Sequence, residues 1–213
     1  MLNVVLIRHG ATAGNVRHCY IGRTEEHLLP AAEAELLKRR NQHVYPEVDC
    51  LYGSPMIRCK ETAQLLYPNQ TMIEIADFRE CDFGAFEGKN YQELSGNADY
   101  QQWIDSQGTI VFPGGELPEA FKKRCITAFE QVLQSEELLR ALEQNRKSKR
   151  DCTVGMVVHG GTIMAIMERF AQPQRSYYEW QCGNGEGYVL ELGDCNSDLG
   201  IKGTLLHCVR HST

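Results

Sequence analysis

Near its amino end the chain reads Leu2-Asn3-Val4-Val5-Leu6-Ile7-Arg8-His9-Gly10. A continuous aliphatic and β-branched run is typical of a strand that is buried on both faces of a sheet. This run stops on arginine, histidine and glycine, and the carboxyl end of a strand is where open α/β sheets place their chemistry. We therefore expect His9 to lie where a nucleophile would.

The same pattern recurs near the other end of the chain. Residues Thr153 to Val158 form a second apolar run, which is followed by His159-Gly160-Gly161 and by a helical stretch from Thr162. Two buried strands that each deliver a histidine to the same edge of one sheet bring the two rings together. A single run of this kind would be weak evidence, but the pair predicts adjacent imidazoles.

Strand-like and helical runs alternate along the early part of the chain, which indicates a largely parallel sheet with helices on both faces. Ser54 before Pro55 predicts a helix start, because serine can cap free amides and proline suits the first helical position. The expected strands are Leu2–Ile7, Val48–Tyr52, Met72–Ile75, Thr153–Val158, Tyr188–Leu192 and Leu205–Val209. The expected helices are Ala31–Gln42, Pro55–Leu66 and one long or broken helix over Pro118–Glu143.

One segment interrupts this pattern. Residues 84–116 are rich in aromatic and polar side chains and contain one helical patch, Tyr91 to Ile104. We expect this segment to cap the carboxyl edge of the sheet within a single domain that spans residues 1–213.

Composition excludes several classes of protein. A formal net charge of −6 argues against nonspecific nucleic-acid binding, which depends on clustered lysine and arginine. No apolar run approaches the length of a membrane span, and no signal segment precedes the first strand, so we expect a cytoplasmic protein without membrane contact. Hydrophobic residues make up 42% of the chain and charged residues 23%, which is ordinary for a globular domain.

The nine cysteines contain no Cys-x-x-Cys pair, so we expect free thiols. The loosest metal candidate lacks the close-paired ligands of structural zinc sites; it comprises Cys182, Cys195, His207, Cys208 and His211. Asp194 to Asp198 imitate the opening of a calcium loop, but Leu199 and Leu205 stand where glycine and glutamate are needed, which predicts a turn. We expect no metal and no cofactor.

Several motifs along the chain form one ordered series, and in this order they resemble the histidine phosphatase superfamily, also called phosphoglycerate mutase-like. The resemblance covers nearly the whole chain. It implies a three-layer α/β/α sandwich with a mixed, mostly parallel central sheet. The motifs are Arg8-His9-Gly10, Ser54-Pro55 with Arg58 and Thr62, Arg79-Glu80 with Phe83-Gly84, Glu87-Gly88, Pro113-Gly114-Gly115-Glu116 and His159-Gly160-Gly161.

The resemblance implies a role for each site residue. His9 would attack phosphorus and Glu80 would act as acid and then as base, with a phosphohistidine between the two steps. The phosphoryl oxygens would be held by Arg8, Arg58, His159, Asn15 and Gly160. Arginine suits this task because its planar fork matches two phosphate oxygens and keeps its charge.

The assignment of Glu80 as the acid has alternatives. A surface glutamate paired with Arg79 is the plain alternative for this residue. Asp82 and Glu87 are nearby carboxylates, of which Glu87 is expected to support a loop.

The reaction type is better defined than the substrate. The compact length and the stretch Phe78 to Gly88 look like α-ribazole phosphatases and small broad-specificity phosphatases, so we favour a phosphomonoesterase acting on a small phosphate ester, with α-ribazole 5′-phosphate as one candidate. The alternatives are a cofactor-dependent phosphoglycerate mutase and a noncatalytic phospho-ligand binder. The oligomeric state stays open, a homodimer being one arrangement.

The chain departs from the family's common pattern at Ala11, Cys19, Ile21 and the stretch Leu29-Pro30-Ala31-Ala32, so the resemblance leaves the substrate open. The cap aromatics could form an apolar wall for a ring such as a base, or could only pack the cap onto the body. These aromatics are Tyr91, Tyr100, Trp103 and Phe112.

Overall fold

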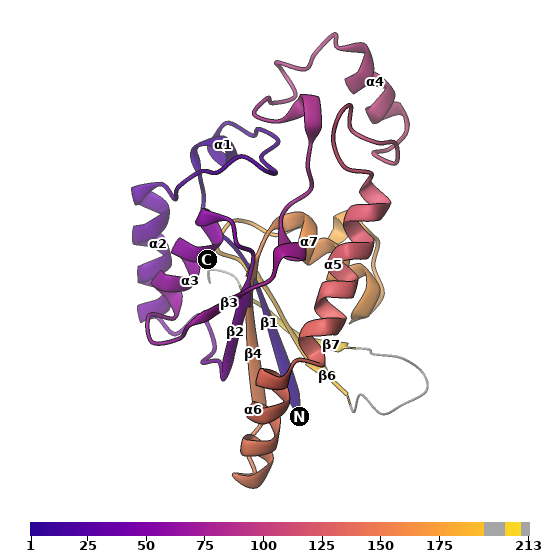
Figure 1. The fold of residues 1–213 in the computed structure, drawn as a ribbon. Helices are drawn as coiled ribbons and strands as arrows, with labels where there is room; N and C mark the ends of the chain where they lie inside the picture. The colour runs from indigo at the N-terminus through magenta and orange to yellow at the C-terminus, as the bar shows by residue number, and fades with distance from the viewer. Residues whose placement is uncertain (194–202, 210–213) are drawn as a thin grey trace.

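The computed structural model describes residues 1–193 and 203–209. Among them, strands form one mixed sheet in the order β3-β2-β4-β1-β6-β7-β5 (Figure 1). Strands β3, β2, β4 and β1 run parallel, and β6 is antiparallel to both β1 and β7. The strands are β1 (Leu2–Arg8), β2 (Cys50–Gly53), β3 (Met72–Glu74), β4 (Cys152–Val158), β5 (Ala171–Gln172), β6 (Gly187–Leu192) and β7 (Gly203–Val209).

The α-helices lie on both sides of this sheet, and the three-layer α/β fold expected from the sequence is confirmed (Figure 1). Helices α2 and α3 cover one face, whereas α5, α6 and α7 cover the other. The helices are α1 (Ala13–Val16), α2 (Pro30–Asn41), α3 (Ile57–Leu66), α4 (Ala98–Asp105), α5 (Pro118–Leu133), α6 (Glu136–Lys147) and α7 (Gly160–Phe170).

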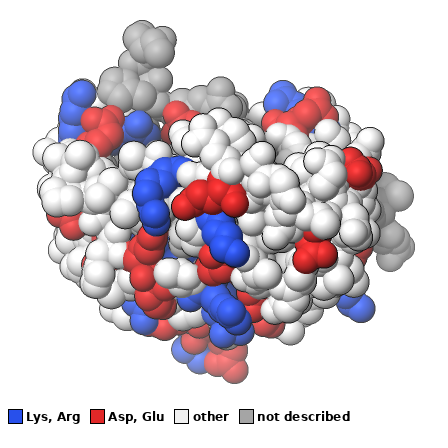
Figure 2. Space-filling model, turned by 90° about the horizontal axis from the view of Figure 1, so that it is seen from above, with Lys and Arg blue, Asp and Glu red and all other residues white. Residues whose placement is uncertain are grey.

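The segment 84–116, with α4, stands beyond the carboxyl ends of β1 and β4, as a cap would (Figure 1). Backbone hydrogen bonds join the start of this segment to its end: Ala85 N donates to Pro113 O, and Glu116 N donates to Asp82 O, each at 2.8 Å. Figure 2 looks down on this end of the molecule, where acidic and basic side chains lie beside one another rather than gathering by sign.

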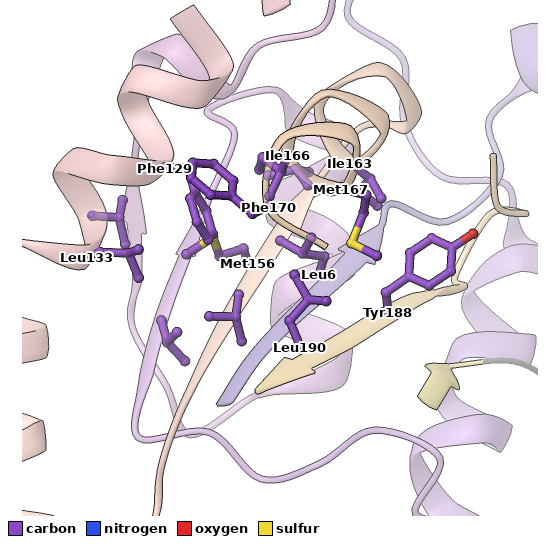
Figure 3. Close-up of a cluster of buried hydrophobic side chains, with 14 of the residues drawn as sticks. Leu6, Phe129, Leu133, Met156, Ile163, Ile166, Met167, Phe170, Tyr188 and Leu190 are labelled. Carbon is purple, nitrogen blue, oxygen red and sulfur yellow. The ribbon is translucent and has the colours of Figure 1, made fainter. Parts of the chain in front are cut away.

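The core explains why β1 reads as an uninterrupted apolar run. Val4 and Leu6 are fully buried under α5 and α7, while Val5 and Ile7 are fully buried under α2 and α3. Alternate residues of a strand point to opposite faces, so a strand covered on both faces needs apolar residues at every position. Figure 3 shows the first of these clusters, in which side chains of α5 and α7 pack over the sheet.

Several element boundaries differ from the sequence-based prediction. The helix expected from Pro55 begins at Ile57 instead, with Met56 as N-cap and no side-chain cap. Ser54 is used otherwise: its Oγ accepts a hydrogen bond from Met56 N at 3.3 Å and contacts His159 Nε2 at 2.8 Å.

The helix expected to be long or broken over 118–143 is broken and extends to Lys147, and the helical patch expected over 91–104 is shorter than predicted. The stretch 118–143 is two helices, because Ser135 accepts a hydrogen bond from Leu138 N and starts α6. The patch Tyr91–Ile104 is helical only from Ala98, where the Asn97 side chain caps α4 by accepting from Tyr100 N at 2.9 Å.

The sequence resembling a calcium loop, 194–198, lies outside the described residues, as do Cys195, His211 and the side chains of His207 and Cys208. Within the described part of the chain, no three His, Cys, Asp or Glu residues are grouped so that they could hold a metal ion. None of the helices described is both long and apolar enough to cross a membrane.

Candidate active site

A cavity of about 350 Å³ opens where β1 and β4 end and the cap begins. Its inner wall combines residues from distant parts of the chain. The predicted site residues that line it are Arg8, His9, Asn15, Glu80 and Gly160. Arg58 and His159 are not on this wall; both are fully buried in the protein behind it.

The two histidines are brought together by strand register. Arg8 pairs with Val158 in the parallel ladder of β1 and β4, so the next residue of each strand is a histidine at the same edge. The ring centroids of His9 and His159 are 5.2 Å apart, with an edge-on orientation.

His9 is held as a neutral ring with a defined tautomer. Its Nδ1 lies 2.7 Å from the carbonyl oxygen of Gly10, so Nδ1–H donates and Nε2 keeps its lone pair. Burial lowers the pKa of His9 well below its usual value, and the positive charges of Arg58 and Arg8 lower it further. A neutral imidazole with a free Nε2 is the form that can act as a nucleophile.

His159 is anchored from the opposite side. Its Nε2 lies 2.8 Å from Ser54 Oγ, and Cys59 Sγ is 3.6 Å from the same nitrogen. Burial lowers the pKa of His159 well below its usual value, with Arg58 and His9 contributing. The ring is therefore neutral before any anion enters the cavity.

Two guanidinium groups have unused donors beside the histidines. Arg58 donates from Nη1 to Thr24 O at 2.9 Å and from Nη2 to Gly22 O at 2.8 Å, and Arg8 donates from Nη1 to Cys182 O at 2.7 Å. The Nε of each arginine is buried without a hydrogen-bond partner among the described residues. Buried N–H groups are rarely left unpaired, so this pair indicates an anion that completes the site.

Glu80 faces these cations and is held by backbone amides. Its Oε1 accepts from Cys81 N at 3.0 Å and its Oε2 accepts from Gly161 N, in the first turn of α7, at 3.2 Å. Burial raises the pKa of Glu80 although both hydrogen bonds oppose the shift. A raised pKa lets a carboxyl group carry a proton closer to neutral pH, as a general acid requires.

Gly161 permits this approach of Glu80. A Cβ at this position would overlap Glu80 Oε1 and lie 2.9 Å from the ring of Phe121. The neighbouring Gly160 has looser surroundings, since a Cβ there would meet Arg8 Cζ at 3.5 Å.

The competing carboxylates have structural partners. Glu87 Oε1 accepts from Gly22 N at 2.8 Å and from Thr24 N at 2.9 Å, which confirms its expected role in loop support. The carbonyl groups of the same two residues hold Arg58. Asp82 accepts from Gly84 N at 2.9 Å and pairs with the exposed Arg23.

Sequence reasoning missed Arg124, on α5. Its guanidinium forms a two-point ion pair with Glu116 at 2.7 and 2.8 Å, and donates to the carbonyl oxygens of Asp77, Arg79 and Glu80. Arg124 thereby fixes the backbone that presents the Glu80 carboxylate. Two signals were available: a charged residue three positions from Phe121 on an apolar helix face, and an unassigned glutamate at the end of the Pro113–Glu116 motif.

Asn184 was missed as well. Its amide donates to His9 O at 3.0 Å and to Asn15 Oδ1 at 3.0 Å. Asn15 Oδ1 also accepts from Thr12 N, so the amide oxygen of Asn15 is occupied and its NH₂ group is the part left for a ligand. The turn signal Gly183-Asn184-Gly185 could have marked this residue.

The four aromatic residues of the cap fall into two groups, those that line the cavity and those that do not. Trp103 and Phe112 line the cavity and also pack against each other, with ring centroids 5.3 Å apart. Tyr100 is not on the wall but stacks on Trp103 at 6.0 Å, and Tyr91 is 59% exposed.

Two neutral imidazoles, two incompletely paired guanidinium groups and a carboxyl group at one edge of an α/β sheet form an arrangement typical of phosphoryl-transfer proteins. Comparison with known families agrees: the profile of the histidine phosphatase superfamily (branch 1) matches residues 4–200. The chain belongs to this superfamily.

Curated relatives bear on the activity, and a solved structure bears on the fold. The chain is 28% identical over 180 residues to a metal-independent phosphoserine phosphatase of Arabidopsis thaliana, covering 79% of this chain and 68% of the plant protein. It is 27% identical over 176 residues to a 2,3-bisphosphoglycerate-dependent phosphoglycerate mutase of Cytophaga hutchinsonii, covering 77% and 75% of the two chains. The α-ribazole phosphatase of Shigella flexneri superimposes with a TM-score of 0.73 at 18% identity, covering 99% of this chain and 98% of that one, which shows a shared fold. Family and relatives together support a phosphatase, and hence a hydrolase, activity.

Proposed function

We propose that this protein is a metal-independent phosphomonoesterase that hydrolyses a small phosphorylated metabolite through a phosphohistidine at His9. The observation that carries the proposal is the Nδ1 hydrogen bond of His9 to Gly10, 2.7 Å long, on a ring that lines the cavity with Glu80 and Arg8. It leaves the Nε2 lone pair available at the inner end of the cavity, where Arg8 lines the wall.

The first displacement forms the phosphoenzyme. His9 Nε2 attacks phosphorus, the bond from phosphorus to the ester oxygen breaks, and the departing oxygen takes the proton of Glu80. Arg8, Asn15 and the amide of Gly160, which line the cavity, hold the phosphoryl oxygens. Arg58 and His159, which are buried directly behind the wall, complete this cradle once the substrate enters. Such a step asks the protein mainly for positioning and charge stabilisation.

The second displacement returns the enzyme to its starting state. Glu80, now ionised, takes a proton from water while the water oxygen attacks phosphorus. The bond between phosphorus and Nε2 breaks, and inorganic phosphate leaves. Glu80 is protonated again, so protons balance over the cycle.

We favour hydrolysis over mutase chemistry because a mutase needs a phosphorylated resting enzyme and a site for transfer between two hydroxyl groups of the substrate. The resemblance to the superfamily leads us to expect an additional arginine-bearing segment in its phosphoglycerate mutases, between the acid and the second histidine, and we find no counterpart of it in this sequence. A noncatalytic binder would need the arginine cradle but would have no use for both His9 and Glu80.

The test combines labelling with a substrate panel. Wild-type protein is incubated with ³²P-labelled esters, quenched in base to preserve phosphohistidine, and compared with His9→Ala. His27→Ala is the matched control, since that ring is exposed and pairs with Glu61. We expect label and turnover in the wild type and control but neither in His9→Ala; label on another residue would contradict the assignment.

The panel separates the alternatives. Release of inorganic phosphate is measured for α-ribazole 5′-phosphate, phosphoserine, fructose bisphosphates and 3-phosphoglycerate. Isomerised product without phosphate release would indicate a mutase. Binding without any turnover or label would indicate a phospho-ligand binder.

A further inference from the structure

The outer part of the cavity offers little to a second anionic group. Among the described residues that line it, the cationic side chains are Arg8, at the inner end, and Lys122, on α5. Lys122 Nζ lies 2.9 Å from Glu168 Oε2 and 4.3 Å from the centre of the Tyr177 ring. Its charge is therefore already balanced within the protein.

A negative charge stands on the same wall. Glu119, in the first turn of α5, is exposed and lines the cavity near Lys122. A substrate carboxylate or second phosphate bound here would face Glu119 and would have to compete with Glu168 for Lys122. Desolvating a charge without a free partner is unfavourable, so the wall selects against anionic alcohols.

The wall is instead suited to flat rings. Aromatic side chains from the body and from the cap line it, and many of them already contact one another, as do Phe83 and Phe112 with centroids 5.2 Å apart. A preformed aromatic surface can stack a ring with little loss of side-chain freedom. These side chains are Tyr20, Phe83, Trp103, Phe112, Phe121, Tyr177 and Tyr178.

Uncharged polar groups complete the wall. Gln107, Thr109 and Gln181 line the same cavity. Such groups recognise hydroxyl groups and ring nitrogens without requiring charge.

We propose that the site takes monophosphate esters of uncharged, ring-bearing alcohols and discriminates against esters whose alcohol carries a carboxylate or a second phosphate. This inference rests on the proposed phosphatase function. It places an aromatic or nucleoside-type leaving group between the cap and the first turn of α5.

The test compares esters of primary alcohols so that leaving-group chemistry stays similar. We expect kcat/KM to fall from 2-phenylethyl phosphate, whose alcohol is uncharged and bears a ring, through glycerol 1-phosphate, whose alcohol is uncharged without a ring, to 3-phosphoglycerate, whose alcohol carries a carboxylate. The step between the esters of uncharged alcohols and 3-phosphoglycerate should be about tenfold or more. A preference for 3-phosphoglycerate over 2-phenylethyl phosphate would overturn the inference.

Substitutions at two positions, Glu119 and Phe112, locate the cause. Glu119→Lys adds an unpaired cation and should raise kcat/KM for 3-phosphoglycerate relative to 2-phenylethyl phosphate by about tenfold, whereas the size-matched Glu119→Gln should do less. Phe112→Leu should reduce the advantage of the ring-bearing ester while leaving the ratio of glycerol 1-phosphate to 3-phosphoglycerate unchanged. Unaltered ratios after substitution at both positions would refute the assignment of this wall.

The outcomes also separate this inference from the function on which it depends. If anionic esters are hydrolysed best through a labelled His9, the phosphatase proposal stands and the substrate class is wrong. If no ester is hydrolysed and no label forms, both are wrong.

Discussion

Replacing Gly161 with alanine should move the general acid without unfolding the protein. The new Cβ would overlap Glu80 Oε1 and approach the Phe121 ring at 2.9 Å. The overlapping atom is the end of a side chain, so the carboxylate can retreat while the backbone stays. Relief of the overlap requires a shift of about 1 Å, and a displacement of that size costs about a hundredfold in rate.

The chemistry of the leaving group provides the assay. Glu80 also activates water in the second step, which both esters share, so the comparison uses kcat/KM, which covers only the steps up to departure of the leaving group. An alkyl ester needs a proton from Glu80 as it departs, so kcat/KM for an alkyl phosphate should fall about a hundredfold in Gly161→Ala. The p-nitrophenolate ion leaves without protonation, so the loss with p-nitrophenyl phosphate should be about tenfold smaller. Gly160→Ala, whose Cβ would meet Arg8 at 3.5 Å, should lose less with the alkyl ester. Equal losses for both esters in Gly161→Ala would refute the reasoning.

Two further predictions concern stability and positioning. Burial holds the pKa values of His9 and His159 below their unfolded value of about 6.5, so their contribution to stability is complete above that pH and is lost as the pH falls. In urea titrations at a series of pH values, His159→Asn should lose less unfolding free energy on acidification than the wild type. An unchanged dependence of unfolding free energy on pH would contradict this prediction. Arg124→Gln should destabilise the fold by about 3 kcal/mol and reduce turnover of alkyl esters more than of p-nitrophenyl phosphate. A double-mutant cycle with Glu116→Gln should show that the two substitutions are energetically coupled. Strictly additive effects would argue against a joint role of Arg124 and Glu116 in holding the backbone at Glu80.

Much of the fold could be predicted because its signals are local. The apolar runs of β1 and β4 are buried on both faces, and burial on both faces is what removes polar residues from a strand. Element ends were harder to predict. Ser54 has the properties of a helix cap, but its hydroxyl group bonds to His159, which is 105 positions away in the chain. A contact with a residue so far away in the chain cannot be recognised from the sequence around Ser54.

The candidate site likewise contains residues that the sequence predicts and residues that it does not. His9, Glu80 and the arginines stand in recognisable motifs, whereas Arg124 and Asn184 act on the backbone of residues far from them in sequence. The pairing of Lys122 with Glu168 is also invisible in the sequence, and it turns a basic residue of the wall into one without available charge.

The amino-acid order by itself determined the strands, the motif residues and their common sheet edge, because periodicity and strand direction are properties of short segments. Only the tertiary structure decided which tautomer His9 adopts, which donors of Arg8 and Arg58 stay unpaired, and how charge is balanced along the cavity wall. Those features depend on distances between groups that are remote in the chain, and burial among such groups sets both their hydrogen bonding and their pKa values.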